Sequence, residues 1–185
     1  MLISAHSGYP RWINSGADFI EIDIRRDASG VVVLAHDELR PGDKPVTLAH
    51  VLEIAGGRIG FQLDLKEAGY EPEVVMAALD RMKPEKLVVT TEHDSSINII
   101  KSHFPQVRVG ASRQQVERGN ADFVSLEPVH ATDDALAYCR RNAIPVWIWT
   151  VDDKKQMKRL IADPRVECLI TNRPDRAMKL RSARS

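Results

Sequence analysis

The sequence predicts an α/β protein in which eight parallel strands close into a compact (β/α)₈ barrel with a short hairpin extension after strand two. Three observations predict it. Short apolar runs alternate with helical patterns along the whole chain of 185 residues, which is typical of a parallel sheet. Eight such runs remain when the hairpin is set aside, the number that a closed barrel needs. Polar residues gather where these strands end, as they do around the mouth of a barrel.

An open, doubly wound sheet would show the same alternation and is the alternative fold. The chain is shorter than most (β/α)₈ barrels, so the connections must be tight. The polar strand ends favour the barrel, because a barrel gathers the ends of all eight strands around one mouth. No linker or low-complexity tract divides the sequence, and we therefore expect a single domain over residues 1–185.

The expected strands are short runs rich in Val, Ile and Leu. They lie at residues 2–5, 19–24, 59–65, 87–90, 107–110, 123–126, 145–150 and 168–171. In the second strand Ile20, Ile22 and Ile24 alternate with Glu21 and Asp23, the period-2 pattern of a strand with an apolar and an acidic face. A further run at residues 31–35 follows a Ser-Gly pair and predicts a hairpin on this strand.

The expected helices fall between these strands. They lie at residues 47–55, 71–82, 95–103, 113–118, 133–142 and 153–162, with at most a short first helix at residues 9–15. Several have ordinary start or stop signals: Thr132 and Asp152 precede helical patterns, and Pro84, Pro105 and Pro145 follow them. The helices thus separate nearly every pair of consecutive strands.

Composition narrows the classes of function. The hydrophobic share of 43% and charged share of 28% are those of a globular protein, and a net charge of zero gives no reason to expect nucleic acid as a partner. No apolar run reaches the ~20 residues of a membrane helix, and the N-terminus has no signal-peptide pattern. Cys139 and Cys168 fit a reduced, cytoplasmic protein and have no metal spacing. We expect a small molecule as the partner.

Three acidic residues at strand ends form a candidate metal site. Glu21 and Asp23 lie on one face of the second strand, and Asp64 lies on the third strand, where Gln62, Asp64 and Lys66 alternate with apolar residues. Clustered carboxylates suit Mg²⁺ or Ca²⁺. Unpaired carboxylates in one cavity repel one another, so a cation or Lys66 must compensate them. A purely structural ion network of Lys66 with the acids is the alternative.

Two histidines are candidates for proton transfer. His6 follows the first strand and His36 follows the hairpin, and an imidazole exchanges protons near neutral pH. Trp149, near the end of strand seven, is a candidate pocket wall, although core packing is the alternative. Glu127 and Asn172 end strands six and eight and are candidates for substrate binding. The sequence contains no P-loop, GxGxxG or GxSxG motif.

The motifs that contain these residues resemble the glycerophosphodiester phosphodiesterase family and its barrel superfamily, which includes venom-type phospholipase D enzymes. Ala5-His6-Ser7-Gly8 is similar to the family's opening His-Arg-Gly, and the segment from Gly16 to Arg25 to its Gly-Ala-Asp-x-Ile-Glu-x-Asp-Val. The segment from Ser29 to Asp37 resembles its Asp-Gly…His-Asp hairpin. The other matching pieces are Pro45-Val46-Thr47-Leu48, Asp64-Leu65-Lys66, Trp149-Thr150-Val151 and Ile170-Thr171-Asn172-Arg173-Pro174-Asp175.

The resemblance implies metal-dependent attack on a phosphodiester. It implies that Glu21, Asp23 and Asp64 hold Mg²⁺ or Ca²⁺, that Lys66 binds a phosphate oxygen, and that the two histidines exchange protons with nucleophile and leaving group. The nucleophile is either water or a hydroxyl of the substrate, which would give a cyclic phosphate. A barrel that binds a phosphorylated ligand without cleaving it is the alternative, and an unrelated sugar-phosphate barrel is a weaker one.

Three departures from the family pattern concern the substrate. Ser7 stands where the family has a phosphate-binding arginine, so Arg25 or another residue would have to supply that charge. The Pro-Glu-Asn-Thr stretch after the opening motif is absent, and the segment from His36 to Thr47 is short. We therefore expect an open mouth with a reduced substrate-selecting part.

Overall fold

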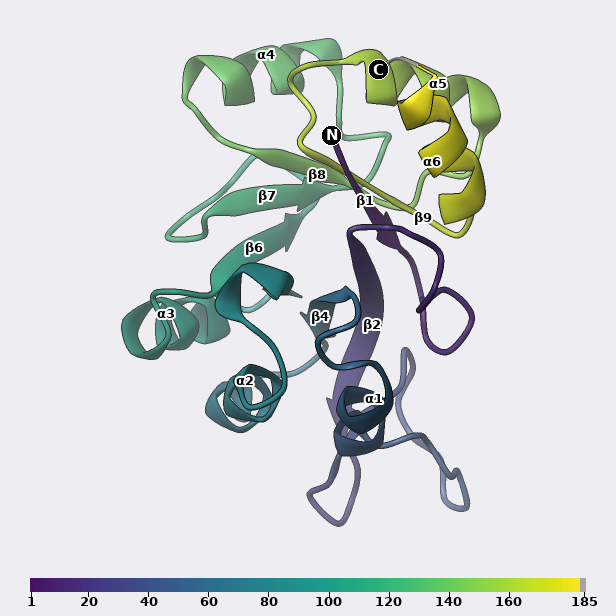
Figure 1. Ribbon diagram of the computed structural model, residues 1–185. Helices are drawn as coiled ribbons and strands as arrows, with labels where there is room; N and C mark the ends of the chain where they lie inside the picture. The colour runs from purple at the N-terminus through teal and green to yellow at the C-terminus, as the bar shows by residue number, and fades with distance from the viewer. Residues whose placement is uncertain (184–185) are drawn as a thin grey trace.

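The computed structural model describes residues 1–183, in which strands alternate with helices as expected (Figure 1). The strands are β1 (Leu2–Ala5), β2 (Phe19–Arg26), β3 (Val32–Leu34), β4 (Gly60–Leu65), β5 (Leu87–Thr91), β6 (Arg108–Arg113), β7 (Phe123–Leu126), β8 (Val146–Ile148) and β9 (Cys168–Thr171). The α-helices are α1 (Leu48–Ala55), α2 (Glu71–Leu79), α3 (Asp94–His103), α4 (Asp133–Arg141), α5 (Lys154–Ala162) and α6 (Pro174–Ser182). None of these helices is long and apolar enough to span a bilayer.

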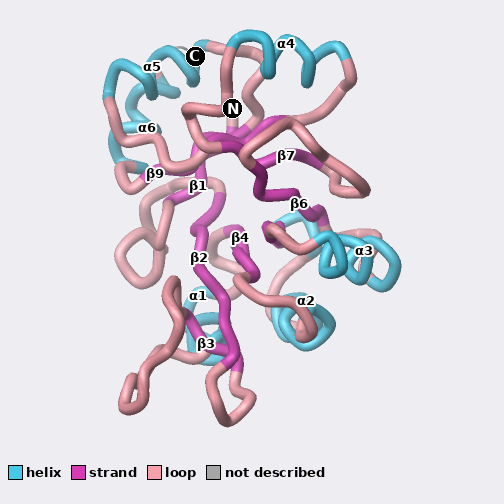
Figure 2. Tube along the Cα trace, turned by 180° about the vertical axis from the view of Figure 1, so that it is seen from behind, coloured by secondary structure: helices cyan, strands magenta, loops and turns pink. Residues whose placement is uncertain are grey.

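Eight of the strands form a closed parallel ring. The order is β1-β9-β8-β7-β6-β5-β4-β2, and β1 also pairs with β2, which closes the ring. The (β/α)₈ prediction is therefore confirmed, because an open doubly wound sheet would leave two free edges. The ninth strand, β3, pairs antiparallel with the end of β2 and lies outside the ring, as the hairpin prediction requires. Figure 2 shows this hairpin extending away from the barrel.

The alternation of side chains along the strands produces two apolar cores. The larger one lies between the ring and its helices and contains Ile20, Leu63 and Val89. The smaller one consists of Phe19, Val88, Phe123, Trp147, Cys168 and Ile170. The Phe123 and Trp147 rings in it stack with their centroids 4.5 Å apart. The smaller cluster comes from the strand positions that alternate with those of the larger one, so it fills the inside of the ring below the polar strand ends.

Two strand glycines make room for these rings. A Cβ at Gly110 would lie 2.2 Å from the Phe123 ring, and one at Gly60 would lie 2.5 Å from the Phe19 ring. The requirement at both positions is space for an aromatic ring inside a narrow barrel.

Two connections differ from the predicted pattern. Residues 113–118 are not a helix: β6 continues to Arg113, and the chain then turns to Gly119, which has a φ of 55°. This segment offers Val116 as its only apolar side chain, too little to hold a helix on the sheet. Residues 9–15 also form turns rather than a helix. Conversely, α6 was not expected, because few apolar residues mark its buried face.

Candidate active site

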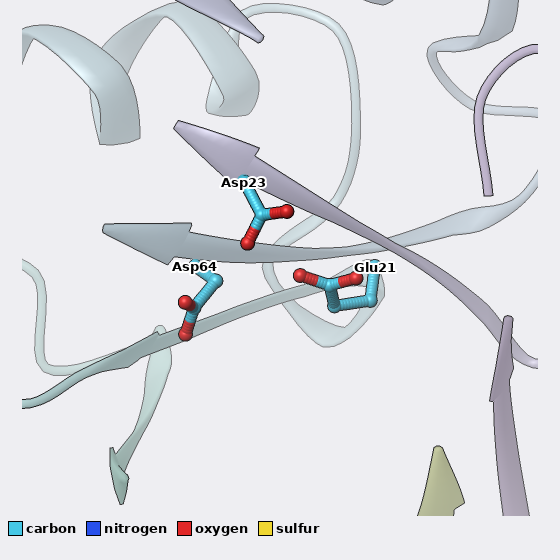
Figure 3. A group of neighbouring side chains, drawn as sticks. All are labelled: Glu21, Asp23 and Asp64. Carbon is cyan, nitrogen blue, oxygen red and sulfur yellow. The ribbon is translucent and has the colours of Figure 1, made fainter. Parts of the chain in front are cut away.

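The three acidic candidates converge at the carboxyl ends of β2 and β4. Asp23 is the register partner of Asp64, and Glu21 is the partner of Gln62 on the same strand pair. One oxygen from each of Glu21, Asp23 and Asp64 lies within 4.8 Å of the others, and Figure 3 shows the three carboxylates turned toward one another. Parallel pairing without a register shift places the inward positions of adjacent strands side by side, so the convergence follows from the sequence pattern.

Lys66 partly neutralises this cluster. Its Nζ lies 2.7 Å from Asp23 Oδ1 and 2.7 Å from Asp64 Oδ2. Burial lowers the pKa of the Lys66 ammonium, but the two carboxylates outweigh burial and raise it above its usual value. The lysine therefore stays charged, and one positive charge faces three carboxylates.

Glu21 is the least compensated of the three acids. It is 4% exposed, and burial together with Asp23 and Asp64 raises its pKa well above the ordinary value of 4.5. The Ser7 N–H donates to Glu21 Oε2 over 2.9 Å, and Ser7 has a φ of 45°, in the left-handed region. Ser7 thus contributes a backbone donor at this point rather than a side-chain charge.

The donor set fits a divalent cation. Three hard carboxylate oxygens converge, which is the ligand type that Mg²⁺ and Ca²⁺ prefer. Three carboxylates with one ammonium leave two negative charges when all are ionised, and a divalent cation would compensate them. Glu21, Asp23 and Asp64 are therefore the residues that would hold the ion.

His6 is held in one orientation by a chain of hydrogen bonds. Its Nδ1 lies 2.9 Å from Asn172 Oδ1, and Asn172 Nδ2 donates to Asp152 Oδ2 over 2.7 Å. Burial raises the pKa of Asp152, but hydrogen bonds from Asn172 and Thr171 outweigh burial and lower it. Asp152 is thus an ionised acceptor that orients the Asn172 amide, and the amide oxygen faces His6. A neutral His6 consequently carries its proton on Nδ1.

The other nitrogen of His6 faces the acidic cluster. His6 Nε2 lies 3.9 Å from Glu21 Oε2. With the proton on Nδ1, this nitrogen has a free lone pair and can accept a proton from a molecule in the cavity.

His36 is placed by the hairpin rather than by the ring. Its Nδ1 lies 2.8 Å from Asp37 Oδ1, and its side chain is 69% exposed. Arg25 Nε donates to the His36 carbonyl over 3.1 Å, and the same guanidinium pairs with Glu67. Arg25 therefore connects the hairpin to the chain that follows Lys66.

One cavity joins these groups. Its lining consists of His6, Glu21, Asp23, His36, Gln62, Asp64, Lys66, Glu92, Ser112, Ser125, Trp149 and Ile170. Part of its polar lining is linked by hydrogen bonds. Ser4 donates to Gln62 over 2.8 Å, and Thr90 donates to Asp64 Oδ1 over 2.6 Å.

Seven of the ten site residues predicted from the sequence line this cavity. The other three lie elsewhere: Arg25 binds Glu67, Asn172 holds His6, and Glu127 lines a neighbouring hollow together with Trp149.

Sequence reasoning did not assign a role to several residues of the site. Gln62, Glu92, Ser112 and Ser125 line the cavity, and Asp152 orients Asn172. The first four occupy strands or strand ends, where a strict count of inward positions would have found them. Asp152 carried only a helix-start signal.

Comparison with known proteins places this geometry in context. No family model matches the chain. A glycerophosphodiester phosphodiesterase from Caldanaerobacter subterraneus subsp. tengcongensis is 22% identical over an aligned length of 219 residues, covering 94% of this chain and 90% of the relative. The alignment is longer than this chain, so the relative contains insertions that this chain lacks.

Solved structures show the same fold. A glycerophosphodiester phosphodiesterase from Parabacteroides distasonis superposes with a TM-score of 0.83 at 18% identity, covering 99% of this chain and 97% of that one. An Oleispira antarctica phosphodiesterase in complex with its product sn-glycerol-3-phosphate gives 0.81 at 14% identity and covers 97% and 96%. In sequence along most of its length, and in fold, the chain is similar to glycerophosphodiester phosphodiesterases, the family that its motifs resemble.

Proposed function

We propose that this protein is a metal-dependent phosphodiesterase that hydrolyses glycerophosphodiesters or closely related phosphodiesters. The observation that carries the proposal is the convergence of three carboxylates, one lysine and two histidines in one cavity. The sequence relative is named a glycerophosphodiester phosphodiesterase, and one structural neighbour is a phosphodiesterase in complex with its product sn-glycerol-3-phosphate. Both support this substrate class.

Charge stabilisation falls to the acidic cluster and Lys66. A divalent cation held by Glu21, Asp23 and Asp64 would neutralise negative charge that develops on the phosphate oxygens. The Lys66 ammonium lies at the edge of the same cluster and adds a positive charge for a phosphate oxygen.

Proton transfer falls to the histidines. The free lone pair of His6 Nε2 accepts the proton of the attacking water. His36, whose Nδ1 lies beside Asp37 Oδ1, gives a proton to the departing alkoxide. One water is consumed, one P–O bond breaks, and an alcohol and a phosphomonoester are released. Attack by a substrate hydroxyl would use the same groups and give a cyclic phosphate.

The test is a phosphorus NMR spectrum of the products. Glycerophosphodiesters with different alcohols are incubated with the protein, with added Mg²⁺ or Ca²⁺ and separately with EDTA. We expect a phosphomonoester signal that EDTA abolishes. A cyclic phosphate signal would replace hydrolysis with cyclisation, and turnover that EDTA leaves unchanged would refute the metal role.

A barrel that binds phosphorylated ligands without cleaving them is the second candidate. The ammonium of Lys66 already contacts two of the three carboxylates, and Ser7 supplies no side-chain charge for phosphate. The absence of product with every ester, together with measurable binding of sn-glycerol-3-phosphate by calorimetry, would select this candidate over catalysis.

A further inference from the structure

The net charge of zero conceals a separation of charge within the molecule. Between Asp153 and Ser182 the chain contains nine Lys and Arg residues against four Asp and Glu residues, while the whole chain has 26 of each kind. This segment includes α5 and α6, which lie side by side on one flank of the barrel in both views (Figures 1 and 2). We call the cationic residues of these helices and of their N-terminal ends the α5–α6 basic face, leaving out Arg181, which pairs with Asp18. They are Lys154, Lys155, Lys158, Arg159, Arg173, Arg176 and Lys179.

Helix α5 turns its charged side outward. Met157, Leu160 and Ile161 are its buried residues, whereas its lysines and Arg159 are all exposed. Lys154 and Lys158 stand at i, i+4 spacing, and so do Lys155 and Arg159. Like charges at this spacing destabilise a helix slightly. The basic face therefore costs the fold some stability.

Among the described residues, the free charges of the face are its four lysines and Arg159. Arg173 pairs with Asp175, and Arg176 donates to the Asp152 carbonyl. Among the described residues, the lysines of the face form no ion pair. Lys154 and Lys179 also line a hollow of about 720 Å³ between the two helices.

The face reaches the rim of the cavity. Helix α5 begins shortly after β8, which leads to Trp149, and α6 begins two residues after Asn172. The N-terminal ends of both helices therefore lie at the mouth of the barrel, and a surface that contacts this face lies beside the opening.

We propose that the α5–α6 basic face docks on an anionic lipid bilayer. Exposed lysines spread over two adjacent helices match a flat surface of diffuse negative charge. Nucleic acid fits less well, since the segment 154–182 contains no aromatic residue for base stacking and its Arg173 is already paired. Each lysine near an anionic surface strengthens binding about fivefold, so four of them contribute several hundredfold.

The test is co-sedimentation of the full chain with vesicles. Vesicles of phosphatidylcholine are compared with vesicles that also contain phosphatidylglycerol, at low and at physiological salt. The variant carries Lys154→Gln, Lys155→Gln, Lys158→Gln and Lys179→Gln. A control with the same change of net charge carries Lys44→Gln, Lys83→Gln, Lys86→Gln and Arg140→Gln, all exposed and outside the face.

We expect the unmodified protein and the control to sediment with anionic vesicles only, more strongly at low salt, and the variant to lose roughly a hundredfold or more in affinity. Equal binding of variant and control would overturn the assignment to this face. No binding of the unmodified protein at low salt would overturn the proposal itself. Tighter binding of a single-stranded RNA than of vesicles would replace the bilayer by nucleic acid. These outcomes do not depend on phosphodiesterase activity.

Discussion

Replacing Glu21 by glutamine should stabilise the protein at neutral pH when no divalent cation is present. The Glu21 carboxylate lies within 4.8 Å of the acidic oxygens of Asp23 and Asp64. At that separation the repulsion between the Glu21 carboxylate and each of the two aspartates amounts to about 3 kcal/mol for an effective dielectric constant near 20. The Lys66 ammonium offsets roughly one of the two, so removing the charge should stabilise the fold by about 3 kcal/mol. In a chain of this size this gain corresponds to about 6–12 °C in Tm.

The pH dependence identifies the cause. Because the folded-state pKa of Glu21 is raised, the folded protein keeps this proton at pH values where the unfolded chain has released it. Stability therefore falls as the pH rises from the ordinary pKa of 4.5 through the raised value, and stays low above it. The Glu21→Gln variant lacks this decline, so its advantage should vanish near about pH 4 and be complete above the raised pKa.

Urea unfolding in EDTA, at about pH 4 and at a pH above the raised pKa of Glu21, measures the difference in stability between the variant and the unmodified protein. Glu53→Gln, on the exposed side of α1, is the matched control and should change nothing. Saturating Mg²⁺ or Ca²⁺ should stabilise the unmodified protein by about 2.7 kcal/mol at a hundred times Kd, and the Gln variant by less. A Glu21→Gln variant that is less stable than the unmodified protein in EDTA at neutral pH would refute the reasoning.

Substitutions at four further positions test other parts of the structure. His6→Ala and His36→Ala should each lower kcat by ~10² or more without changing the urea midpoint, and unchanged turnover in either would exclude that histidine. Arg25→Met should lower kcat more than it raises KM, because it removes the hydrogen bond to the His36 carbonyl. Arg25→Lys should restore little of the lost activity. An Arg25→Met variant with normal kcat would show that the hairpin is positioned without Arg25. Gly110→Ala should cost about 1–3 kcal/mol in urea unfolding, because its Cβ would meet the Phe123 ring at 2.2 Å, and a smaller cost would mean that the ring can move.

The strands and the acidic cluster could be predicted because both follow from period-2 alternation. Glu21, Asp23 and Asp64 share the face that the parallel register turns inward, so their convergence was already implicit in the spacing. The (β/α)₈ closure followed from the count of apolar runs and from the polar strand ends.

The roles of the rim residues could not be predicted in the same way. Arg25 follows Glu21 and Asp23 at the same spacing, yet its long side chain reaches Glu67 instead of the cavity. Asn172 ends a strand at the mouth, but Asp152 turns its amide toward His6. Such partnerships join distant loops, and local pattern does not determine them.

The aromatic cluster inside the ring has a kinetic consequence. Phe19, Phe123 and Trp147 fill the barrel beneath the polar strand ends, so the cavity is a blind well rather than a passage. Substrate and both products would therefore pass through the same opening, and they would enter and leave one after another. In the proposed reaction, the product that keeps the phosphoryl group would carry the charge that Lys66 attracts and would compete with the next substrate for this opening.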